Sequence, residues 1–125
     1  MVLLDTHVLL WLLFNDDKLS RMATDALKNN TCCISMASFW EMSIKTSLGK
    51  LRLPKSLDEI AEVCDNMGIE VCSITLNDCL TLQRLPWIHR DPFDRIIISH
   101  ALTEGLPLIS HDGIIQKYSD LEVIW

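Results

Sequence analysis

No stretch of this sequence is long and apolar enough to cross a membrane. The longest candidate, Val8 to Phe14, is far shorter than the roughly 20 residues that a membrane-spanning helix needs. The chain also lacks the opening of a secretory signal, because Asp5 interrupts its hydrophobic start after Leu4. We therefore expect neither a membrane segment nor a cleaved leader.

The cysteines lack the spacing of a metal or redox motif. There are five, an odd number, and no two are arranged as CxxC. Cys32, Cys33 and Cys72 lie inside apolar segments, where buried and reduced thiols are expected. This usage predicts a cytoplasmic protein.

Basic residues are few. Eleven Lys and Arg stand against 17 Asp and Glu, which gives a formal net charge of −6. Taken alone, this charge argues against a nucleic-acid partner, because phosphate binding usually leaves a basic surface. The objection is limited if several acids surround cations, since bound metal ions would supply the positive field that a phosphodiester needs.

The remaining composition is that of an ordinary globular protein. Apolar residues make up 49% of the chain and charged residues 22%, with no internal repeat or low-complexity segment. A chain of 125 residues suits one compact domain and leaves no room for a second core. We expect a single domain over residues 1–125.

Short apolar segments alternate with helical patterns along the chain. The segments that fit strands are 2–4, 31–36, 69–74, 107–110 and 123–125. Helices are predicted at 6–14, 20–28, 39–48, 56–67, 75–84 and 92–104, with a short helical turn near residue 114. Strands that alternate with helices predict an α/β fold with a mainly parallel sheet and right-handed crossovers.

Several helix ends carry clear local signals. Ser56 and Glu59 form the pattern of a capping box, which predicts a helix start. Asp91 followed by Pro92 is a second sharp start, and Gly105 is the expected end of that helix. The chain before Asp91, from residue 84, is the most loop-like part of the sequence.

Four acids fall where this fold would gather them at one edge of the sheet: Asp5, Glu41, Asp94 and Asp112. Ligands of open α/β sheets bind beyond the carboxyl ends of the strands. Asp5 ends the first strand, and Asp112 lies just beyond the fourth. Glu41 lies about one turn into its helix and Asp94 in the first turn of another, so both can reach this edge.

Such a cluster predicts a particular chemistry. Carboxylate oxygens favour a hard cation, Mg²⁺ or Mn²⁺, over zinc. A cation held there would polarise a phosphoryl oxygen and lower the pKa of an attacking water. Hydrolysis of a phosphodiester is the reaction that this chemistry serves best.

Each acid also has a simpler structural interpretation. Asp94, and Asp91 more so, can cap a helix or complement its dipole. Asp112 fits a turn residue, and Glu41 fits a solvated helix face. Asp5 is the hardest to explain in this way, because a carboxylate directly after an apolar strand is costly unless something pairs with it.

Four segments also resemble a known family in their order and spacing: LLDTHVLLW, SFWEMSIKTSLGKL, RDPFDRIIISHA and PLISHD. The sequence resembles the PIN-domain family and, within it, the VapC-type toxins of bacterial toxin–antitoxin systems. This resemblance implies a three-layer fold around a five-stranded parallel sheet. It also implies a magnesium-dependent ribonuclease toxin that is inhibited by a cognate antitoxin and is often dimeric.

The resemblance assigns roles to individual positions. Its catalytic and metal-binding acids fall on the four named above, Asp5, Glu41, Asp94 and Asp112. Thr6 and Ser110 match its small hydroxyl residues, which orient a carboxylate or a water. Asp91 is interpreted as an N-cap first and a ligand second.

The basic residues that could bind RNA are few: Lys45, Lys50, Arg52, Lys55, Arg90 and Arg95. Of these, Lys45 and Arg95, together with Trp87, are the predicted substrate contacts.

The histidines offer weaker clues. His7 and His111 lie within two residues of proposed ligands, and for both we favour a local hydrogen-bonding role over a substrate contact. His100 is expected to be structural, and His89 to be exposed in its loop. Trp87 is the best tryptophan for contact with a base or an antitoxin.

Other classes of protein remain as alternatives. A phosphoacceptor signalling domain would need an adjacent acidic pair after the first strand and a lysine after the last, and neither is present. The D-x-D opening of a HAD-type phosphatase is absent from Asp5-Thr6-His7. A catalytically idle PIN-like module that only binds a partner protein stays open.

Overall fold

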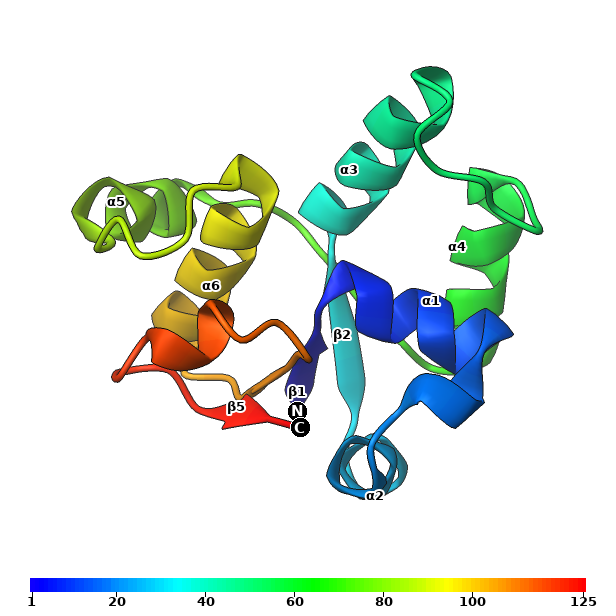
Figure 1. Ribbon diagram of the computed structural model, residues 1–125, viewed down its shortest axis with the longest axis horizontal. Coiled ribbons are helices and arrows are strands. Elements are labelled where there is room, and N and C mark those ends of the chain that lie inside the picture. The colour runs from blue at the N-terminus through cyan, green and yellow to red at the C-terminus, as the bar shows by residue number, and fades with distance from the viewer.

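A five-stranded sheet forms the centre of the molecule (Figure 1). The computed structural model describes all 125 residues. The strands are β1 (Val2–Leu4), β2 (Cys32–Ser35), β3 (Glu70–Cys72), β4 (Leu108–Ile109) and β5 (Val123–Ile124). Their order is β3-β2-β1-β4-β5, and every neighbouring pair is parallel. The predicted α/β class and parallel sheet are confirmed.

Six α-helices connect the strands: α1 (Thr6–Phe14), α2 (Arg21–Asn29), α3 (Met36–Ser47), α4 (Leu57–Asn66), α5 (Leu76–Arg84) and α6 (Pro92–Glu104). Short 3-10 turns lie at Asp16–Lys18 and Ile115–Lys117. None of the helices is both long and apolar enough to span a membrane.

The local signals for helix ends are present as predicted. Ser56 and Glu59 form the capping box of α4, and the Asp91 side chain caps α6. Gly105 ends α6 with a φ of 63°, a backbone conformation that a residue with a Cβ adopts only at a cost. The helix predicted at 39–48 begins earlier, at Met36, because the Ser35 hydroxyl accepts from the Ala37 N–H and starts α3 directly after β2. The strands β3 and β4 are shorter than the predicted segments 69–74 and 107–110.

Helices cover both faces of the sheet, which gives three layers (Figure 1). Leu4 and Ile34 pack into the cluster under α1 and α4, on the right in Figure 1, and α2, at the bottom. Leu3 and Cys33, their neighbours along the strands, pack into the cluster under α5 and α6. Because both faces are buried, β1 is a continuous apolar run and β2 is apolar up to Ser35, without alternation.

Two of the three cysteines that we expected to be buried are buried, and the third is half-buried. All five are free, and Cys32 and Cys33 are buried as expected. Cys72 is half-buried, because it lies on β3, an edge strand that is largely exposed. Burial raises the pKa of the Cys32 thiol, so the protonated form is favoured.

The order of the strands locates a binding crevice. From the central strand β1, the chain moves outwards through β2 to β3 and then returns to the other side for β4 and β5. The direction of winding therefore reverses between β1 and β4. In folds of this type, ligands bind at such a reversal, beyond the carboxyl ends of the strands. Asp5 directly follows β1, and Ser110 directly follows β4.

Candidate active site

A pocket of about 430 Å³ opens at the carboxyl ends of β1 and β4. It is lined by five acids, one lysine and three aromatic side chains: Asp5, Glu41, Asp91, Asp94, Asp112, Lys45, His7, Trp11 and His111. The fold thus brings the four acids proposed as ligands into one cavity, although they are spread over more than 100 positions of the sequence.

Asp5 is almost fully buried and has both of its carboxylate oxygens in hydrogen bonds. The Thr6 N–H donates to Oδ1 at 2.7 Å, and the Ser110 hydroxyl donates to Oδ2 at 2.7 Å. Burial raises the pKa of Asp5, and these two hydrogen bonds oppose that effect. Ser110 therefore offsets part of the cost of a carboxylate directly after an apolar strand.

Glu41 is also buried, so it does not lie on a solvated helix face. The Thr6 hydroxyl donates to Glu41 Oε1 at 2.8 Å, and Lys45 Nζ lies 2.6 Å from Oε2. The hydrogen bond to Glu41 raises the pKa of Lys45. Thr6 and Lys45 together fix the direction of the Glu41 carboxylate.

Asp91 precedes α6 as its N-cap and Asp94 lies in the first turn, and both line the pocket. Asp91 Oδ1 accepts from the N–H groups of Phe93 at 2.8 Å and of Asp94 at 3.3 Å, so Asp91 has the predicted capping role. Burial, followed by the charges of Asp5 and Asp91, raises the pKa of Asp94 to about 7. Burial and the neighbouring charges therefore both disfavour the charged form of Asp94 in the metal-free protein.

Asp112 both shapes a turn and faces the pocket. Its Oδ1 accepts from the Ile114 N–H at 2.8 Å, and its Oδ2 lies 2.9 Å from His89 Nε2. Burial by itself would raise the pKa of Asp112, but the hydrogen bonds from His89 and Ile114 outweigh it, and the pKa is lowered. The turn and the site therefore use different oxygens of one carboxylate.

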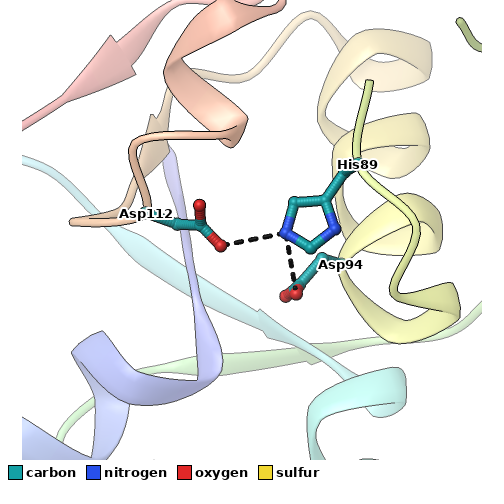
Figure 2. A group of neighbouring side chains, drawn as sticks. All are labelled: His89, Asp94 and Asp112. Carbon is teal, nitrogen blue, oxygen red and sulfur yellow. Dashed lines mark hydrogen bonds and ion pairs between the residues drawn. The ribbon is translucent and has the colours of Figure 1, made fainter. Parts of the chain in front are cut away.

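His89 joins two of these acids, which the sequence did not indicate. Its side chain is buried, whereas we expected an exposed loop residue. Figure 2 shows that His89 Nε2 points at both Asp112 and Asp94, with Oδ2 atoms at 2.9 and 3.2 Å. The expectation is wrong because Tyr118 and Arg95 hold the backbone of His89 in place. Only the place of His89 two residues before the Asp91 cap could have suggested its role.

The proton of His89 can be located from its other contact. The Asp91 N–H donates to His89 Nδ1 at 3.1 Å, so Nδ1 is an acceptor. The neutral ring then carries its proton on Nε2, which donates to the two carboxylates. In this tautomer His89 has no lone pair for a metal on Nε2. In this tautomer His89 positions Asp94 and Asp112. The ligand atoms of His89, Asp94 and Asp112 all lie within 4.8 Å of one another, so the three side chains could also hold a metal ion together if the ring proton left Nε2.

The loop that carries His89 is fixed by a buried arginine and a tyrosine. The Arg95 guanidinium donates to the carbonyls of Leu85, Pro86 and His89 at 3.0–3.1 Å. The Tyr118 hydroxyl accepts from the His89 N–H and donates to the Pro86 carbonyl, both at 2.8 Å. Arg95 is only 4% exposed, so the structure does not support its predicted contact with substrate, which stays a prediction. Its charge is used to hold the loop.

Trp87 lies outside the acidic pocket. It is 76% exposed, and its ring stacks on the guanidinium of Arg95 at 3.8 Å. It lines a separate hollow with Arg90 and Pro92. Its contact with a substrate or a partner stays a prediction, while Lys45 is the one proposed substrate contact that lines the pocket.

Replacing Arg95 with methionine is expected to lower the free energy of unfolding by about 3 kcal/mol, because three buried carbonyls lose a charged donor. Tyr118→Phe, which removes one hydroxyl from the same loop, should cost about 1 kcal/mol. Urea denaturation followed by circular dichroism measures both values. Equal stability of Arg95→Met and the wild type would contradict the structural role of Arg95.

The remaining histidines divide into two kinds. His100 is buried and its Nδ1 lies 2.9 Å from Asp78 Oδ2, in keeping with the expected structural role. No hydrogen bond joins the exposed rings of His7 and His111 to another side chain or to the backbone, so the local hydrogen-bonding role that we favoured for them stays a prediction. Each ring packs against Trp11, with centroids 5.9 Å apart in both cases.

A family model described as PIN domain matches residues 2–121 of the chain. The chain belongs to the PIN domain family. The acids of this PIN domain come from four separate segments, and all four segments lie within the match. Among curated proteins, none matches the sequence.

Solved structures with the same fold as this PIN domain come from several bacteria. VapBC2 from Rickettsia felis, bound to a DNA fragment from its promoter, gives a TM-score of 0.72 at 16% identity over 98% of this chain and 97% of that one. A toxin–antitoxin complex from Klebsiella pneumoniae gives a TM-score of 0.65 at 17% identity, over 97% of this chain and 95% of that one. DNA-bound VapBC from Salmonella typhimurium gives a TM-score of 0.63 at 17% identity, over 98% of this chain and 97% of that one. These likenesses establish the fold.

Proposed function

We propose that this PIN domain is a metal-dependent endoribonuclease that acts as the toxin of a toxin–antitoxin pair. The main support is the pocket that collects Asp5, Glu41, Asp94 and Asp112 at the point where the sheet reverses its winding. The toxin role is supported by the likeness to solved structures, one of which is described as a toxin–antitoxin complex. Membership of the PIN family, whose domains are typically nucleases, supports hydrolysis of a phosphodiester.

The residues of the pocket suit Mg²⁺ or Mn²⁺. All four proposed ligands offer carboxylate oxygens, the donors that these cations prefer. The raised pKa of Asp94 reflects mutual repulsion and burial, which a divalent cation would relieve. When bound, the cation would polarise the phosphoryl group and favour attack by water. No sulfur donor lines the pocket, and His89 Nε2 is occupied as a donor.

The other side chains keep the proposed ligands in place. Ser110 and Thr6 each hold one oxygen of Asp5 or Glu41, and His89 holds Asp94 near Asp112. Such outer contacts tune the affinity of a metal site. Lys45 is the only Lys or Arg in the lining, which supports its proposed contact with a phosphate oxygen of the substrate.

The proposal includes an antitoxin, a second copy of the chain and a cytoplasmic location. Apolar side chains are exposed along α5 and next to the edge strand β3: Leu76 by 74%, Leu80 by 46%, Val71 by 40% and Ile74 by 38%. Exposed apolar surface of this kind supports a protein partner.

An arginine side chain of an antitoxin would also suit the acidic pocket. Light scattering after gel filtration tests the dimer, and the five free cysteines support a reducing compartment.

A catalytically idle PIN module is the competing function. It is favoured by the contacts that already engage the pocket: Lys45 lies 2.6 Å from Glu41, and His89 engages both Asp94 and Asp112. A module of this kind would bind its partner without cleaving RNA.

Removal of divalent metal is expected to stop RNA cleavage by the purified protein, and added Mg²⁺ or Mn²⁺ should restore it. Gel electrophoresis of a labelled RNA pool measures the rate. Asp5→Asn, purified in the same way, is the control against a contaminating ribonuclease and should be inactive. Equal rates with and without chelator, or with Asp5→Asn, would exclude the proposed activity and favour the idle module.

A further inference from the structure

Part of the pocket lining is aromatic, and the acid chemistry does not account for it. His7, Trp11 and His111 line the same cavity as the acids. The Trp11 ring centroid lies 5.9 Å from those of His7 and His111, and 5.6 Å from that of Trp125. We call the three pocket residues His7, Trp11 and His111 the aromatic wall.

The aromatic wall is fixed in place and still accessible. His7 and Trp11 are one turn apart on α1, and His111 follows β4. Trp125 packs against the core and contacts both Trp11 and His111, with its centroid 4.9 Å from that of His111. His7 and His111 are exposed and Trp11 is half-buried, so part of each ring is accessible to a ligand.

The wall is close to the proposed reaction centre along the backbone. His111 is the neighbour of Asp112, and His7 is two residues from Asp5. A group that rests on these rings therefore lies next to the carboxylates. In a polynucleotide, each phosphate links two riboses, and each ribose carries a nucleobase that can reach a surface beside the phosphate.

Basic side chains of the pocket contribute little to the binding of a polynucleotide. Lys45 is the only basic side chain in the lining other than the histidines, and it is paired with Glu41. Arg95 is buried under its loop. Five carboxylates in the same cavity oppose the approach of a phosphate until a cation is bound. Stacking on aromatic rings supplies attraction that does not depend on net charge.

We propose that the aromatic wall is a stacking site for one nucleobase of single-stranded RNA, next to the phosphate that is cleaved. The inference rests on the proposed ribonuclease function for the nature of the strand. The base must be unpaired, because both faces of a base inside a duplex are covered by its neighbours. Since every base has a flat aromatic face, the site selects strand structure more than base identity.

The test compares two short ligands that differ only in their bases. One is a fluorescein-labelled 2′-O-methyl hexaadenylate, and the other is the same sugar–phosphate chain without bases. Fluorescence anisotropy with Mg²⁺ present gives both dissociation constants, and electrophoresis verifies that the ligands stay intact. Trp11→Ala is expected to weaken binding of the hexaadenylate roughly 10-fold and to leave the base-free chain unchanged. His111→Ala, an exposed position, should act in the same direction.

Two variants serve as controls. Trp11→Phe keeps a ring in the wall and should restore most of the affinity. Trp40→Ala removes a tryptophan that is 55% exposed on α3 and does not line the pocket, so it should bind as the wild type does. Circular dichroism melting verifies that each variant is folded.

Several results would overturn the stacking site. Equal losses for both ligands, or no loss in the folded Trp11→Ala and His111→Ala variants, would show that the wall does not hold a base. If these variants lost affinity only for a partner protein, the wall would be a protein-binding surface. Since binding is measured without cleavage, base-dependent binding by a protein that cleaves no RNA would refute the nuclease function and leave the stacking site standing.

Discussion

Asp94→Asn is expected to lower kcat/KM for metal-dependent RNA cleavage by at least about 100- to 1000-fold, the loss typical when one charge-stabilising group is removed from an active site. The amide has nearly the shape of the carboxylate but lacks its charge, and it binds Mg²⁺ poorly. Initial rates on a labelled RNA over a range of Mg²⁺ concentrations measure the effect. A wild-type rate in Asp94→Asn would remove Asp94 from the proposed site.

The same substitution should make the metal-free protein more stable near neutral pH. Burial and the charges of Asp5 and Asp91 raise the pKa of Asp94 from 3.8 to about 7 in the folded protein. Between these values the folded state holds a proton that the unfolded chain has released, so stability falls as pH rises. Asparagine cannot ionise, and it removes this fall.

Thermal melting in the presence of chelator at acidic and at neutral pH measures the difference. Each kcal/mol that is recovered raises the Tm by about 4 °C in a domain of this size. Asp65→Asn, at an exposed position on α4, is the matched control and should leave the pH dependence unchanged. If Asp94→Asn melts like the wild type at both pH values, the carboxylates do not repel each other as the structure indicates.

The location of the acids was predictable because it depends on topology. Parallel strands end at a common edge, so Asp5 after β1 and Asp112 after β4 had to lie near one another once the strands were recognised. The helix starts at Ser56 and Asp91 were predictable for a different reason, since a capping residue and its helix are neighbours in the chain.

The residues that were misinterpreted depend on contacts that form only when the chain has folded. Arg95 directly follows Asp94 and has the pattern of a surface cation, yet the fold turns it towards three backbone carbonyls. His89 is buried because Tyr118, 29 residues away, holds its N–H. Trp11 meets His111 only after β1 and β4 have paired. No local pattern in the sequence encodes such partners.

His89 carries the second large expected effect, because one N–H holds two proposed metal ligands. His89→Ala leaves Asp94 and Asp112 without the donor that lies 3.2 and 2.9 Å from their oxygens. Loss of a partner of this kind typically lowers metal affinity 10- to 100-fold. We expect the Mg²⁺ concentration for half-maximal cleavage to rise by about that factor, while high Mg²⁺ recovers most of the rate.

His89→Gln separates positioning from packing. Glutamine keeps an N–H donor at a similar reach, so it should need less Mg²⁺ than His89→Ala even if both variants lose similar stability. The comparison requires cleavage rates against Mg²⁺ concentration and melting curves for both variants. If the two needed equal Mg²⁺, or if His89→Ala bound Mg²⁺ as tightly as the wild type, the histidine would support only the loop. A lower Mg²⁺ requirement in His89→Gln than in His89→Ala would mean that the buried N–H of His89 sets the affinity of the acids for metal. Arg95 and Tyr118 hold the loop that supplies this N–H.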